Sequence, residues 1–114
     1  MNEDQARDFY DQFLTTAIHA GEIHESGGAH IAPIYQTSTF TFDDMAAVER
    51  YAAGDSDSYI YTRGGHPGRQ ALAAKLAALE GYGLIQAARS AGSSEPVVGA
   101  EIFSSGMAAL SAAL

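Results

Sequence analysis

Cysteine is absent from this 114-residue sequence, which excludes disulfide bonds, thiolate catalysis and cysteine-ligated metals. Long apolar runs are absent too, because none approaches the ~20 residues that a membrane-spanning helix needs. The stretch from Met1 to Asp11 is polar and acidic, unlike a signal or transit peptide. We therefore expect a cytoplasmic protein that does not enter the membrane.

Basic side chains are scarce. Six lysines and arginines stand against fourteen aspartates and glutamates, for a net charge of −8. This balance argues against nucleic acid and anionic membranes as partners, although one or two local donors can still hold a small anion. The four histidines match no metal-binding spacing, and we expect no metal site. The length and the apolar fraction of 46% suit one small domain.

Two segments in the first half have helical patterns. Residues 4–14 gather apolar side chains on one side. A second helix is capped by Asp43 or Asp44 and closed by Gly54. Between them, residues 15–42 lose the helical periodicity and predict an extended arm or loops. Such a segment usually borrows its core from a following domain or a neighbouring subunit.

The strongest helical pattern begins at Pro67, a residue suited to the first helical position, and ends at Gly81. Its apolar stripe consists of leucines spaced four and three residues apart, at Leu72, Leu76 and Leu79. The single lysine, Lys75, falls away from this stripe on the helical wheel. We therefore expect Lys75 to face solvent, where it is a poor candidate for a Schiff-base lysine, because that role needs a desolvated site.

The last third of the chain is patterned less clearly. Residues 82–99 are weakly periodic and contain a loop at 92–96, and residues 97–103 predict a short strand. A second alanine-rich helix follows and runs to Leu114 without a stop signal. We therefore expect the chain to be truncated inside a larger fold.

The start of this last helix, Ser104-Ser105-Gly106-Met107, is one candidate anion site. Amides at a helix start lack internal partners, and the helix dipole there favours an anion. Gly106 would let a phosphate approach the backbone closely. The alternative is an ordinary serine cap with a glycine chosen for packing.

The loop at residues 59–67 is the second candidate. Arg63 lies among tyrosines and glycines just before a helix, where its guanidinium could clamp a phosphate with two hydrogen bonds. A neighbouring tyrosine hydroxyl could donate another. The alternative is a solvated loop arginine beside two packed tyrosines.

Five motifs, in this order, resemble the start of a known family. They are Ile18-His19-Ala20-Gly21, Pro33-Ile34-Tyr35-Gln36-Thr37-Ser38-Thr39-Phe40, Tyr59-Ile60-Tyr61-Thr62-Arg63, Leu79-Glu80-Gly81 and Phe103-Ser104-Ser105-Gly106-Met107-Ala108-Ala109. The sequence is similar to the Cys/Met-metabolism family of pyridoxal 5'-phosphate (PLP) enzymes. That family includes cystathionine γ-synthase, cystathionine γ- and β-lyases, methionine γ-lyase and O-acetylhomoserine sulfhydrylase.

The resemblance implies an α/β architecture of PLP fold type I and a homotetramer of tight dimers. Residues 1–58 would form an N-terminal helix and extended arm that contact another subunit, and residues 59–114 would begin the PLP-binding large domain. Two departures stand out. Residues 82–98 look like an insertion, and His66 stands where the family usually has asparagine.

The resemblance also implies roles for single residues. Tyr61 and Arg63 would reach the cofactor phosphate of the adjacent subunit, and Tyr61 would have an auxiliary role in activating the lysine amine. The backbone amides of Gly106 and Met107 would bind the same phosphate. The Schiff-base lysine, the ring-stacking tyrosine and the substrate-binding arginine lie beyond Leu114 in the family, so no catalytic residue is assigned here.

The implied activity belongs to sulfur amino-acid metabolism. It is γ- or β-elimination or replacement on cystathionine, methionine or an O-acyl-homoserine, with PLP as electron sink, and we expect the chain alone to be inactive. One alternative is a non-catalytic interaction module from a split or decayed gene that pairs with a partner chain. Another is an unrelated anion-binding α/β fragment.

Overall fold

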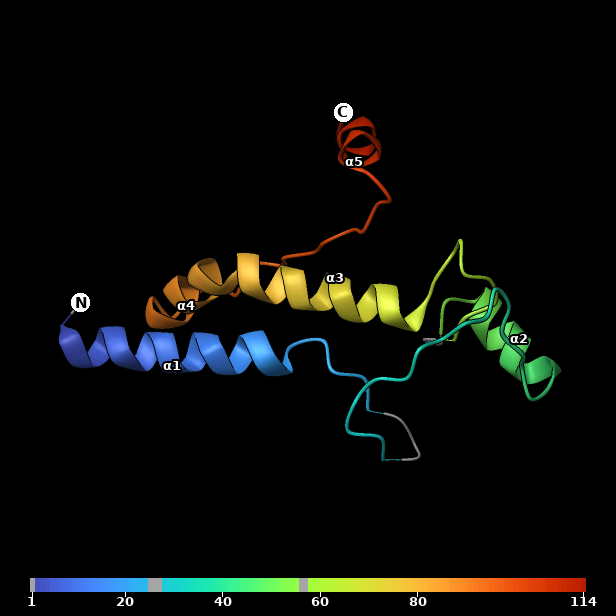
Figure 1. The fold of residues 1–114 in the computed structure, drawn as a ribbon, viewed down its shortest axis with the longest axis horizontal. Helices are drawn as coiled ribbons and strands as arrows, with labels where there is room; N and C mark the ends of the chain where they lie inside the picture. Colours follow the sequence, from blue (N-terminus) through green and yellow to red (C-terminus); the bar gives the residue numbers. More distant parts are fainter. Residues whose placement is uncertain (1, 25–27, 56–57) are drawn as a thin grey trace.

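The computed structural model of the chain describes residues 2–24, 28–55 and 58–114. Within these ranges the ordered elements are helices (Figure 1). They are α1 (Glu3–His19), α2 (Met45–Ala52), α3 (Pro67–Glu80), α4 (Tyr82–Ser90) and α5 (Gly106–Ala113). The described ranges contain no β-strand, only an isolated antiparallel bridge between Thr39 and Tyr61. The sheet that an α/β fold requires is therefore not formed by these residues, and the strand expected at residues 97–103 is absent.

The first helix exists as predicted but is longer than predicted. Asn2 caps it, accepting the amide of Gln5, while the Gln5 side chain accepts the amide of Asn2. The expected end at residue 14 is wrong, because α1 continues to His19. Neither glycine nor proline interrupts residues 15–19, so the helix continues through them. It ends where Ala20 is extended and Gly21 turns the chain with φ +72°.

The predicted ends of α2 and α3 are confirmed. The Asp44 carboxylate accepts the amide of Ala47 at 2.7 Å, and Gly54 follows α2 with φ +78°. Pro67 opens α3, and Gly81 ends it. Gly81 keeps right-handed helical geometry and is also the residue before α4, so a new helix follows it directly. The helix α4 was not predicted.

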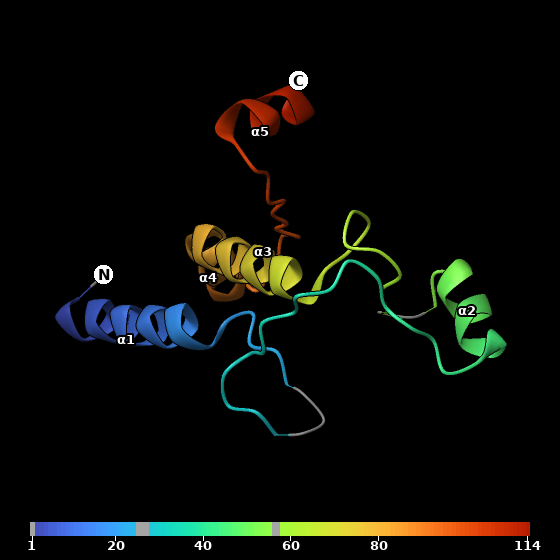
Figure 2. The ribbon, with the colours of Figure 1, turned by 45° about the vertical axis from the view of Figure 1, so that its right-hand side comes forward.

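A small aromatic core joins α1 to the start of α4. Tyr82 is only 6% exposed, and its ring meets those of Phe9 and Phe13 edge to face at centroid distances of 5.1 and 5.3 Å. The Tyr82 hydroxyl donates to the Phe9 carbonyl at 3.5 Å. This cluster holds α1 antiparallel to α3 and α4 (Figures 1 and 2).

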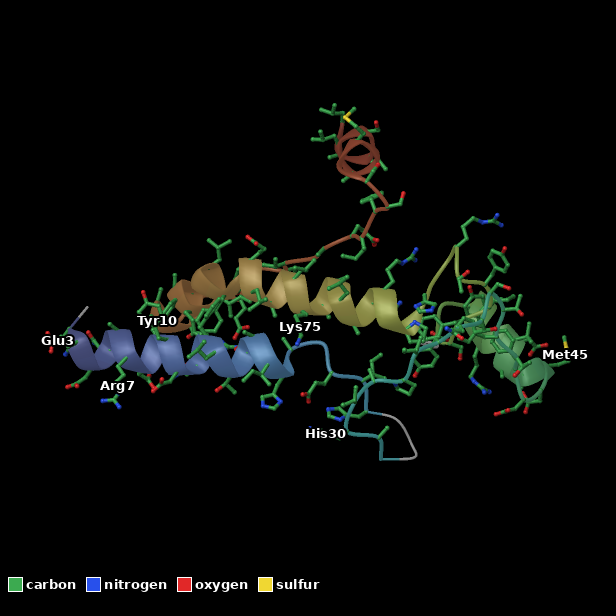
Figure 3. The ribbon with its side chains drawn as sticks, in the orientation of Figure 1. Glu3, Arg7, Tyr10, His30, Met45 and Lys75 are labelled. Atoms are coloured by element: carbon green, nitrogen blue, oxygen red, sulfur yellow. The ribbon has the colours of Figure 1, made fainter. Side chains whose placement is uncertain are left out.

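The face of α3 that packs on α1 is not the leucine stripe. Leu72 and Leu76 remain 47% and 38% exposed. Instead, the Lys75 ammonium donates to the carbonyls of Ala17 and Ile18, at 3.1 and 2.8 Å (Figure 3). The expectation that Lys75 faces solvent is wrong, because a cation that satisfies the last carbonyls of a helix is favoured there by hydrogen bonding and by the helix dipole.

Gly21 allows this contact to be close. A β-carbon at this position would lie 2.2 Å from the carbonyl oxygen of Ala71 and 3.1 Å from the amide nitrogen of Lys75. The backbone just after α1 therefore lies directly against the backbone of α3. Only glycine combines this approach with a positive φ angle at no steric cost.

The chain buries little of its apolar surface. Its accessible surface is 8823 Å² for 11.9 kDa, whereas a folded monomer of this mass exposes about 6,000 Å². Its radius of gyration is 17.7 Å, against about 13 Å for a compact domain of this length. Exposed large side chains include Tyr10, Leu14, Ile18, Met107 and Leu110. No helix of the described residues is long and apolar enough to cross a bilayer.

We expect the isolated chain to unfold without a cooperative transition and to self-associate, because its exposed apolar side chains greatly outnumber those in its core. Calorimetry combined with analytical ultracentrifugation measures both properties. A sharp transition in a monodisperse monomer would contradict this expectation.

Candidate functional site

The loop that carries Tyr61 is paired with the extended arm. The amide of Phe40 donates to the carbonyl of Ile60 at 3.1 Å, and the amide of Thr62 donates to that of Ser38 at 3.0 Å. These two bonds form the bridge between Thr39 and Tyr61. They hold the loop in an extended conformation where it leaves the arm, although no sheet continues from it.

Arg63 is the exposed cation of this loop. Its guanidinium carbon lies 5.2 Å from the centroid of the Tyr61 ring, a cation–π contact that leaves the N–H donors accessible. The ion pairs of the described residues do not include Arg63. Tyr61 itself is 43% exposed. The loop therefore presents a guanidinium without a carboxylate partner, next to a phenol.

The start of α5 has features of both an ordinary serine cap and an anion site, the two interpretations of its sequence. The Ser105 hydroxyl accepts the amide of Ala108 at 3.2 Å, so the serine is an ordinary helix cap. The amides of Gly106 and Met107 occupy the first two helical positions and have no acceptor within the helix. Apart from its chain neighbours and the backbone of its own helix, no atom of the described residues lies within 4 Å of a β-carbon placed on Gly106, which leaves room for an anion.

The structure does not bring these two places together. α5 stands apart from the layer formed by α1, α3 and α4, and also from the loop that precedes α3 (Figures 1 and 2). One copy of the chain therefore presents Arg63 and the α5 amides as separate donor sets.

The donor chemistry fits a phosphate group. A guanidinium can bind two phosphate oxygens, and amides at a helix start bind an anion through hydrogen bonds and the helix dipole. Among the described residues, no cluster of three or more His, Cys, Asp or Glu side chains could hold a metal ion. The observed donors thus favour an anionic ligand.

The resolved pKa shifts lie outside both places. Arg89 contacts Glu95 at 2.6 Å; the hydrogen bond between them lowers the pKa of the Glu95 carboxyl and raises the pKa of Arg89. The hydrogen bond from His19 similarly lowers the pKa of Glu22. Both pairs are exposed.

Sequence reasoning missed the residues that hold the loop at residues 59–67, which we call the Arg63 loop. They belong to the first turn of α3, where His66 is the cap and Arg69 and Gln70 follow. Pro67 was a recognisable signal of the helix start, although histidine is not among the residues that usually cap a helix. The reach of Arg69 back to the loop had no such signal, because it depends on how the chain folds over the helix end.

The chain is similar to known proteins over most of its length. The family described as Cys/Met metabolism PLP-dependent enzyme matches residues 14–114. An L-methionine gamma-lyase of Porphyromonas gingivalis is 51% identical over 69 residues, which are 60% of this chain and 17% of that protein. A probable cystathionine gamma-synthase of Herpetosiphon aurantiacus is 48% identical over 69 residues, 60% of this chain and 19% of that protein.

A more distant relative extends the matched region. The cystathionine gamma-lyase of Saccharomyces cerevisiae is 37% identical over 83 residues, which are 71% of this chain and 19% of that protein. The chain thus spans less than a fifth of the length of these curated relatives.

Proposed function

Because the chain belongs to the family of Cys/Met metabolism PLP-dependent enzymes, we propose that it is the N-terminal part of an enzyme of sulfur amino-acid metabolism. The reaction is γ- or β-elimination or replacement on cystathionine, methionine or an O-acyl-homoserine. The observation that carries the proposal is the exposed Arg63 guanidinium beside Tyr61, which has no carboxylate partner in the described residues. The bound cofactor would supply the electron sink for the reaction.

In this proposal Tyr61 and Arg63 bind the cofactor phosphate of the adjacent subunit. The amides of Gly106 and Met107 bind the phosphate within their own subunit. The separation of the two donor sets within one chain supports this division (Figure 1), since a single phosphate cannot reach both. A helix N-terminus and a guanidinium together would neutralise most of a phosphate dianion.

The finer architecture belongs to the same proposal. Residues 1–58 form an arm against another subunit, and residues 59–114 begin an α/β large domain of PLP fold type I, with an insertion at 82–98, in a homotetramer of tight dimers. The large exposed apolar surface supports it, because such surface needs a partner.

In this proposal Lys75 is not the lysine that holds the cofactor, and the hydrogen bonds of its ammonium to two carbonyls of α1 support this. In the intact enzyme, Lys75→Met is expected to lower stability by about 1–2 kcal/mol, because charged donors to two carbonyls are lost. PLP content and activity are expected to stay unchanged. Calorimetry and the absorbance of bound PLP test these two parts, and a variant that loses its PLP band would contradict the assignment.

The alternative is a non-catalytic module that pairs with a partner chain, which the exposed surface also favours. Whether the reading frame continues past Leu114 into a lysine-bearing domain discriminates between the two.

The activity is tested on the intact protein loaded with PLP. Incubation with methionine, cystathionine or O-acetylhomoserine plus a thiol is expected to release a 2-oxo acid and ammonia, or to form a replacement product. A PLP-loaded protein that converts none of these substrates would contradict the proposed reaction.

A further inference from the structure

The first turn of α3 holds the Arg63 loop at two points, one on each side of Arg63. Before it, the Tyr59 hydroxyl donates to the Gln70 side-chain oxygen. After it, the Arg69 guanidinium donates through Nη2 to the carbonyl of Gly64 at 3.2 Å. Two successive residues of one helical turn therefore fix both ends of the loop.

The loop itself is a tight turn. The Tyr61 carbonyl accepts the amide of Gly64 at 2.9 Å and the amide of Gly65 at 3.2 Å. Arg63 lies inside this turn, so the direction of its side chain follows the orientation of the turn. From outside, the turn is held on its first side by the bond from the Thr62 amide to the Ser38 carbonyl. On its second side it is held by the bond from Arg69 to Gly64.

His66 fixes Arg69 in turn. Its Nδ1 accepts the amide of Arg69 at 3.3 Å, so Nε2 carries the ring proton and donates it to the carbonyl of Tyr35 at 3.1 Å. The His66 and Tyr35 rings also meet edge to face at 6.0 Å. Through His66, the backbone of Arg69 is thereby linked by hydrogen bonds to the extended arm.

We infer that Arg69 is a positioning residue, which orients Arg63 toward the phosphate without binding the phosphate itself. The inference rests on the proposed function of Arg63. The Arg69 guanidinium is directed at a backbone carbonyl, whereas Arg63 has no such partner among the contacts of the described residues. A donor fixed in advance loses less entropy when it binds its ligand.

The surroundings of Arg69 agree with this division of roles. A small open hollow of about 180 Å³ is lined by Gly64, Arg69, Gln70, Ala73, Ala100 and Glu101. The acidic Glu101 beside Arg69 disfavours an anion at that point. An anion is favoured instead at Arg63, which lacks a carboxylate partner in the described ranges.

The experiment measures dissociation constants for PLP and for pyridoxal, which lacks the phosphate, in the intact protein. Arg69→Met keeps the side-chain length and removes the donors. It is expected to weaken PLP binding roughly five- to ten-fold and to leave pyridoxal binding unchanged. In an Arg63→Ala background, Arg69→Met is expected to have no further effect, because Arg69 acts through Arg63. Arg7→Met on α1 is the matched control for the lost charge.

Three outcomes would overturn the inference. PLP binding that is unchanged in Arg69→Met removes the positioning role. Equal weakening for PLP and pyridoxal shows a general structural role. Additive effects in the double variant show that Arg69 binds the phosphate itself. If Arg63→Ala alone leaves PLP binding unchanged, the proposed function of Arg63 fails instead, and the two failures are therefore distinguishable.

Discussion

Arg63→Ala is expected to weaken PLP binding by the intact protein roughly 10- to 100-fold. Hydrogen bonds between charged partners contribute about 1.5–3 kcal/mol each in proteins, which corresponds to factors of this size. The Arg63 side chain is exposed, as phosphate binding requires, and the ion pairs of the described residues do not include it. Equilibrium dialysis or fluorescence titration with PLP measures the loss.

Two further variants make this result specific. Arg63→Lys keeps the charge and loses the paired donors, so its PLP affinity is expected to fall between those of the wild type and Arg63→Ala. Arg7→Ala removes one positive charge from the side of α1 that faces away from α3 (Figure 3) and is expected to change nothing. An Arg63→Ala protein with wild-type PLP affinity would remove the main support for the proposed phosphate site.

Gly21→Ala is expected to release the end of α1 from α3, at a cost of at least about 3 kcal/mol. The left-handed backbone at Gly21 costs an alanine about 1–2 kcal/mol by itself. The new methyl group would lie 2.2 Å from the carbonyl oxygen of Ala71, so one of the two backbones must also move. Hydrogen exchange of the α1 amides in the intact protein measures the free energy of local opening.

Gly54→Ala is a matched control for this substitution. Gly54 also follows a helix with a positive φ angle, +78°, but apart from its chain neighbours no atom of the described residues lies within 4 Å of a β-carbon placed on it. The Gly54→Ala substitution is expected to cost only the backbone strain, about 1–2 kcal/mol. If the two variants open their helices equally easily, the close contact between Gly21 and α3 does not exist in solution.

Capping residues in the sequence predicted several helix ends correctly. Asp44, Gly54, Pro67 and Gly81 end or begin helices as expected, because capping depends on a few neighbouring residues. The predicted end of α1 was wrong, since the helix continues past the point where the apolar pattern fades and ends at His19, just before Gly21. The helix after Gly81 was missed because glycine was taken as a stop, although here it has helical geometry.

The candidate site was also predicted only in part, because only its local features can be recognised in the sequence. Arg63 and the start of α5 stand out in the sequence because each is a local cluster of donors, and their assignment to a phosphate stays a prediction. The supporting residue Arg69 could not be found this way. Its contact with Gly64 depends on the turn that brings the loop back over the first turn of α3.

By itself, the sequence determined the ends of α2 and α3, the absence of cysteine chemistry and the family, since these depend on residue identity and short spacing. Only the tertiary structure decided which face of α3 is used. The leucine stripe predicted one face, yet Lys75 and the backbone beside Gly21 made the contact with α1. The reason is that the carbonyls at the end of α1 need donors, and a neighbouring ammonium satisfies them where leucine cannot.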